Sequence, residues 1–192
     1  KSQRSSAQVG SVDRSSSGAL NPSDASVSTL SLSKEIESAS PEQIRSLLMR
    51  ALDTVDMNEK KMLVSQCLLK MKPENWQGMI TAFSDVTSAS GRDQYDMWKS
   101  TMMRSGQVAG EEAMEHLKTF GLSNMQDEPW QTLYGWGSME PSKAMAWLQK
   151  QESEGLQISN QLYQAVLAGA ALRGSSEAIA LIEAIPIEKA ND

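Results

Sequence analysis

Apolar residues recur at helical spacing from about residue 40 onward. The first stripe follows the i, i+3, i+4, i+7 rule of a helix with one buried face: Ile44, Leu47, Leu48, Ala51, Leu52 and Val55. Ser40 and Pro41 are typical of a helix N-cap and first turn, and Gln43 can complete a capping box. We therefore predict a helix that begins at Pro41 and buries this stripe.

Eight further stripes follow, led by Val64, Trp76, Tyr95, Ala113, Trp130, Ala144, Leu162 and Ala178. Asp56 begins a second capping pattern, and Pro73 separates the next two stripes. The helix that contains Tyr95 is expected to end near Gly106, and a separate helix is expected to end at Gly121. No stretch alternates β-branched or aromatic residues with polar ones, so no strand is predicted.

Corresponding residues repeat at a nearly constant interval. Ala113 and Ala144 begin similar segments 31 residues apart, and Ala178 begins another 34 residues later. A period of this size, with one helix pair per unit, is typical of an α-solenoid, in which neighbouring units must stack to bury their apolar faces. The predicted fold class is all-α: stacked antiparallel helix pairs that form a short right-handed α-solenoid of about nine helices.

The last repeat resembles tetratricopeptide-like repeats. Leu162 and Ala165 lie on a first helix, with Ala178 sixteen residues after Leu162 and Ile182 four further on. The preceding unit departs from that pattern: Trp130 and Ala144 are only fourteen residues apart, and Gly137 replaces the tyrosine expected late in the first helix.

The segment 136–147 is also similar to units of uncharacterised bacterial tandem-repeat proteins, in which a tryptophan, an acidic-Pro pair, an alanine and a second tryptophan recur. These resemblances imply a helical-repeat architecture and, by analogy, binding of a peptide or protein. The period is also close to that of pentatricopeptide repeats. A resemblance to that family would imply an RNA-binding protein with a basic groove, but this chain has no row of lysines or arginines.

The N-terminal part of the chain has a different composition. Residues 1–39 are Ser-rich, with little apolar periodicity, and are predicted to form a disordered tether, although a short helix can begin near Ser33. Residues 40–187 form the predicted helical-repeat domain, and 188–192 a tail. Because the chain begins at Lys1, we expect that a segment has been removed before it; a signal peptide, a membrane anchor and further protein all stay open. We expect an extracytoplasmic or membrane-tethered location rather than a cytoplasmic one.

The net charge of the chain and its cysteine content exclude some classes of partner and of covalent cross-link. The net charge of −6 and the lack of a basic cluster argue against nucleic acid. No stretch is apolar enough for a membrane helix, so no membrane contact is expected from the domain itself. Cys67 is the single cysteine, which excludes an intramolecular disulfide and indicates inert packing.

The sequence offers no set of residues for catalysis, and we predict no catalytic, cofactor or metal site. His116 is the only histidine; Glu112 lies one turn away, but we expect a solvated helix face. Gly135 and Gly137 lack the third glycine and the strand of a phosphate loop. Acidic pairs such as Glu111–Glu112 and Asp127–Glu128 are interpreted as helix starts.

The content of 12 Met and 5 Trp is unusual beside only 2 Phe. Most of these side chains lie on helical stripes and are expected in the core. Some stand too densely for one narrow stripe, and an exposed Trp/Met patch would mark a partner site. The candidate partner-binding residues are Trp98, Met102, Trp130, Trp136 and Trp147.

Two hypotheses about function follow. The first is a non-enzymatic helical-repeat module that binds a protein or peptide partner. The alternative is a regulatory or substrate-positioning segment of a larger enzyme whose catalytic part lies outside this chain. Activity of the domain itself as an enzyme is disfavoured, with His116 as its best candidate residue.

Overall fold

A computed structural model of the protein describes residues 22–87, 92–119 and 127–182. The described residues form nine helices and no strand, which confirms the all-α prediction. The helices are α1 (Pro22–Ser38), α2 (Pro41–Leu52), α3 (Met57–Leu69), α4 (Trp76–Thr87), α5 (Arg92–Lys118), α6 (Glu128–Met139), α7 (Pro141–Ser153), α8 (Asn160–Ala171) and α9 (Ser175–Ile182). No helix in these ranges is long and apolar enough to cross a membrane.

The predicted capping residues begin α2 and α3. The Ser40 main-chain N–H donates to Gln43 Oε1 at 2.9 Å, which is the half of the capping box that the glutamine supplies. Asp56 accepts from the N–H groups of Asn58 and Glu59, both at 2.9 Å, and so satisfies two donors at the start of α3. The predicted burial of Val55 is wrong: α2 ends at Leu52, and Val55 is 96% exposed in the connector.

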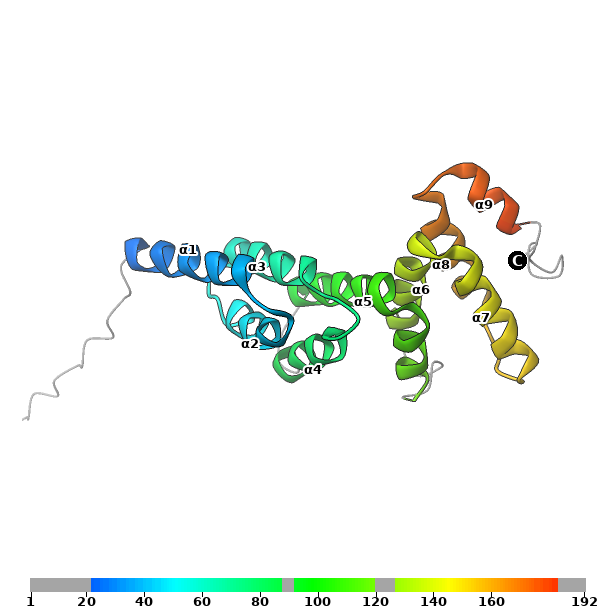
Figure 1. Ribbon diagram of the computed structural model, residues 1–192, viewed down its shortest axis with the longest axis horizontal. Helices are drawn as coiled ribbons and strands as arrows, with labels where there is room; N and C mark the ends of the chain where they lie inside the picture. The colour runs from blue at the N-terminus through cyan, green and yellow to red at the C-terminus, as the bar shows by residue number, and fades with distance from the viewer. Residues whose placement is uncertain (1–21, 88–91, 120–126, 183–192) are drawn as a thin grey trace, which may run out of the picture.

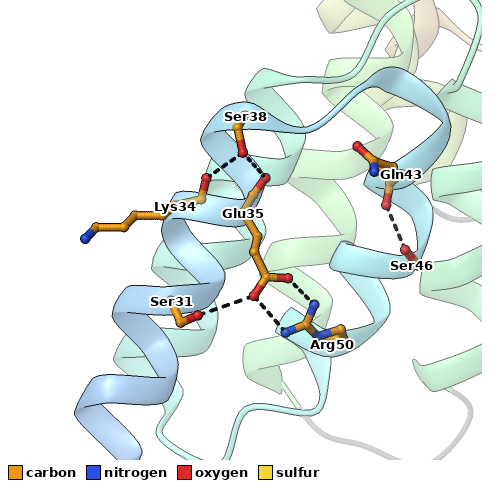
Figure 2. A network of polar contacts seen from close by, with 7 residues as sticks. All are labelled: Ser31, Lys34, Glu35, Ser38, Gln43, Ser46 and Arg50. Carbon is orange, nitrogen blue, oxygen red and sulfur yellow. Dashed lines mark hydrogen bonds and ion pairs between the residues drawn. The ribbon is translucent and has the colours of Figure 1, made fainter.

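Helix α1 corrects the prediction of a disordered tether through residue 39. Residues 22–38 are helical, with Leu32 and Ile36 buried, so two apolar residues four apart give this Ser-rich segment a packed face. The Arg50 guanidinium on α2 binds the Glu35 carboxylate on α1, and Ser31 donates to the same carboxylate (Figure 2). Residues 1–21 and the predicted tail lie outside the described residues.

The helices are arranged in chain order along an elongated molecule. Helices α1–α4 lie at one end, α7–α9 at the other, and α5 and α6 between them (Figure 1). The main packing contacts join each helix to partners one or two positions away along the chain. The finer prediction, a right-handed solenoid, stays a prediction.

Glycines bring the central helices into main-chain contact. Gly106 on α5 and Gly135 on α6 lie at one crossing: a Cβ on Gly106 would be 1.9 Å from the Thr132 carbonyl oxygen, and a Cβ on Gly135 would be 1.9 Å from that of Met103. Gly169 on α8 lies almost as close to α6, where a Cβ would be 2.3 Å from the carbonyl oxygen of residue 134. The glycines of this region therefore pack helix against helix.

The segment from Arg92 to Lys118 consists of two helices joined by a kink, as predicted, but the break lies at Gly110 and not near Gly106. Helix α5 continues through Gly106 and is interrupted only at Gly110, whose φ of 22° and ψ of −97° are not helical. Gly106 lies within the helix, where its lack of a side chain allows the close crossing with α6. Gly121, where the second helix was expected to end, lies outside the described residues.

Candidate functional site

A cavity of about 600 Å³ opens beside the interruption in α5. Its volume lies in the range of small-ligand sites. It is lined by Pro73, by the α5 residues Gly106, Gln107, Val108, Ala109, Gly110, Glu111, Glu112 and Glu115, by Trp136 and Glu140, and by Lys143 of α7. The cavity therefore lies where the α3–α4 connector, α5, and the α6–α7 junction meet.

The conformation of Gly110 makes room for the indole of Trp136. A Cβ on Gly110 would lie 2.5 Å from Trp136 Nε1 and 2.7 Å from Trp136 Cδ1. The positive φ of Gly110 is also one that residues with side chains rarely adopt. Glycine is thus required here twice, for its conformation and for the space above the ring.

Trp136 is a buried aromatic residue with an unused donor. Its side chain is only 2% exposed, and its ring contacts Trp147 edge-on with the ring centroids 6.3 Å apart. Its Nε1 is buried without a hydrogen-bond partner in the described structure. The pKa of the Glu140 carboxyl, one turn further on, is lowered mainly by Lys143 and also by the nearby indole of Trp136, but Trp136 Nε1 does not reach hydrogen-bond geometry with it. An unsatisfied buried N–H costs about 1–3 kcal/mol, so it calls for a specific explanation.

Carboxylates dominate the charge around the cavity. Glu111 and Glu112 are exposed, directly after the break at Gly110, and make no ion pair among the described residues. This agrees with their interpretation as helix-start residues, since carboxylates favour the positive end of a helix. Glu115 accepts from Trp147 Nε1 at 2.8 Å and lies 3.6 Å from Lys118 Nζ.

The cations near the cavity already have partners. Lys143, the one basic residue among the described residues that line the cavity, binds the Glu140 carboxylate and holds the pKa of Glu140 below its ordinary value. Arg104, one turn before the cavity, donates to the Leu68 carbonyl oxygen at 3.2 Å and to Gln107 at 3.0 Å. The exposed charge left at the rim is therefore that of Glu111 and Glu112.

The structure separates the five candidate residues instead of gathering them on one exposed patch. Met102, Trp136 and Trp147 are at most 3% exposed, so the expectation of exposure is wrong for these three. Each lies on the inward face of a helix whose neighbours cover it. Only Trp136 lines the cavity.

The other two candidates, Trp98 and Trp130, are partly buried against the core. Trp98 Nε1 donates to Glu128 at 3.2 Å, and Trp130 stacks on Tyr134 with the ring centroids 5.2 Å apart. Both are thus occupied by contacts within the chain. A role for them in partner binding stays a prediction.

The side chains of His116 and Cys67 are both packed against other residues of the chain. The His116 ring is half-buried and meets Trp76 edge-on at 5.6 Å, which corrects the expectation of a solvated face. Cys67 is fully buried, and burial raises the pKa of its thiol to about 12, as expected for inert packing. Among the described residues no three His, Cys, Asp or Glu side chains are placed to hold a metal ion.

The cavity itself was missed at the level of sequence, although one signal was present. A helix was expected to end near Gly106 and another to begin with Glu111 and Glu112, which leaves an interrupted segment between them. Nothing local indicates that Trp136, 26 residues beyond Gly110, fills the space at that interruption. Comparison of the chain with protein-family models, curated proteins and solved structures finds no match.

Proposed function

We propose that this chain is a helical module that binds a protein or peptide partner, and that the partner occupies the cavity beside Gly110. The single observation that carries the proposal is the cavity itself, about 600 Å³ in volume and built from three separate parts of the chain. The buried lining residues Gly106, Gly110 and Trp136 form its floor and the exposed Glu111 and Glu112 its rim, a combination that suits recognition of an extended segment with a polar side chain.

Peptide panning tests this proposal. A library of random nonapeptides is selected on the full chain, and the selected peptides are then measured against two variants. Ala109→Trp places an indole in the cavity, whereas Ala171→Trp places one at an exposed position of α8. We expect the peptides to lose binding to the first variant and to keep it with the second.

Circular dichroism and thermal unfolding establish that both variants are folded; if Ala109→Trp is not, Ala109→Leu fills less of the same space. The proposal is wrong if the selected peptides bind the cavity-filled variant as well as the unchanged protein, or if selection yields no peptide. The alternative, a regulatory or substrate-positioning segment of a larger enzyme, stays a prediction.

A further inference from the structure

The charge and the unused donor of the cavity identify what kind of segment fits it. Glu111 and Glu112 are two adjacent exposed carboxylates without an ion pair among the described residues. Two carboxylates on the same short stretch of chain give that part of the rim a negative potential, which a nearby cation lowers. Lys143 is held by Glu140, so the chain supplies no second cation from the cavity lining.

The rim of the cavity favours a cation, whereas its floor requires a hydrogen-bond acceptor. Trp136 Nε1 is a buried donor without an acceptor in the described structure, and Trp136 lines the cavity. An occupant that carries an acceptor, such as a main-chain carbonyl, can satisfy this donor. The N–H is covered in the unbound protein, so a side chain at the wall must rotate; Glu140 and Lys143 are both exposed, so they can rotate away as an intact pair.

The next inference rests on the proposed function. We propose that the occupant of the cavity is an arginine or lysine residue of a partner protein. Its side-chain cation binds Glu111 and Glu112 at the rim, and a neighbouring main-chain carbonyl accepts from Trp136 Nε1. An acidic or purely apolar segment can satisfy only the donor at the floor and leaves the rim carboxylates without a counter-charge. The net charge of the whole chain, −6, attracts the same class of segment from a distance.

Three matched peptides test this inference. Each is an acetylated and amidated heptapeptide of alanines whose central residue is arginine, citrulline or glutamate; citrulline keeps the shape of arginine without its charge. Hydrogen bonds that involve charged groups are the stronger ones, so the arginine peptide should bind about tenfold more tightly than the citrulline peptide. The glutamate peptide should bind more weakly than either.

The double variant Glu111→Gln/Glu112→Gln should abolish the preference for arginine over citrulline. Its control, Glu37→Gln/Asp53→Asn, changes the net charge equally on α1 and after α2, and should keep that preference within about twofold because distant charges are screened by salt. If both double variants lose the preference for arginine, the rim carboxylates are not its source and the inference is wrong.

The failures of the two proposals are distinguishable. Equal binding of the arginine and citrulline peptides, blocked by Ala109→Trp, overturns the cation inference and leaves the cavity as a peptide site. Binding of panned peptides at the cavity without binding of any of the three heptapeptides has the same consequence. Panned peptides that Ala109→Trp does not block overturn the proposed function itself.

Discussion

Replacing Gly106 by alanine tests the main-chain contact between α5 and α6. The added Cβ would lie 1.9 Å from the Thr132 carbonyl oxygen, whereas ordinary close C···O contacts begin near about 3.3 Å, so the helices must separate by about 1.4 Å. The obstacle is main chain and cannot rotate away. Overpacking of this kind costs about 3 kcal/mol, and the better helix propensity of alanine returns about 1 kcal/mol. The expected net loss is about 2 kcal/mol.

Gly78→Ala is the matched control, because it makes the same change in a helix without the contact. Its nearest neighbour to an added Cβ is Arg45 Cδ at 3.5 Å, an ordinary contact. Helix propensity alone then stabilises the protein by about 0.5–1 kcal/mol. Thermal unfolding followed by circular dichroism measures both: for Gly106→Ala we expect Tm to fall by about 4–8 °C, and for Gly78→Ala we expect it to rise. A Tm that rises in both variants would refute the close crossing.

Three further predictions follow from individual residues. Cys67, whose thiol pKa is raised to about 12 by burial, should react with Ellman's reagent at pH 8 only when the protein unfolds, and prompt labelling of the native protein would contradict its burial. Tyr95 donates to Asp127 and is the largest cause of the lowered pKa of that carboxyl. The stability that Asp127 contributes is therefore present above about pH 4 and is lost as pH falls through its lowered folded-state pKa; Tyr95→Phe should raise that pKa in an NMR titration, and an unchanged value would refute the contact. Gly110→Ala should destabilise the protein by about 2–3 kcal/mol and shift Trp136 fluorescence to longer wavelength, whereas a silent substitution would contradict the positive φ and the indole beneath it.

The sequence was sufficient for features that depend on neighbours along the chain. The stripe of α2 and the caps at Ser40 and Asp56 were predicted correctly, because capping and helical periodicity involve residues only a few positions apart. The all-α class follows from the same signals. Val55 was misplaced because periodicity alone does not indicate at which residue a helix ends.

Features that depend on tertiary contacts were missed. Gly106 was taken for a helix end because glycine weakens a helix, whereas here its lack of a side chain admits α6. The length of helix α1 was missed, since only a short helix near Ser33 was expected: Leu32 and Ile36 are few apolar residues, which form a packed face only where a neighbouring surface covers them. Trp136 was expected on an exposed groove, and its actual place beneath Gly110 depends on a backbone conformation that no local pattern encodes.

The most direct test of the proposed binding site is the indole ¹H–¹⁵N signal of Trp136, assigned with Trp136→Phe and followed during titration with the arginine heptapeptide. Trp98 serves as an internal reference, since its indole N–H already donates to Glu128, away from the cavity lining. We expect the Trp136 signal to move downfield to saturation, as a donor that gains an acceptor should, while the Trp98 signal stays in place. Saturable binding with an unmoved Trp136 signal would contradict this expectation.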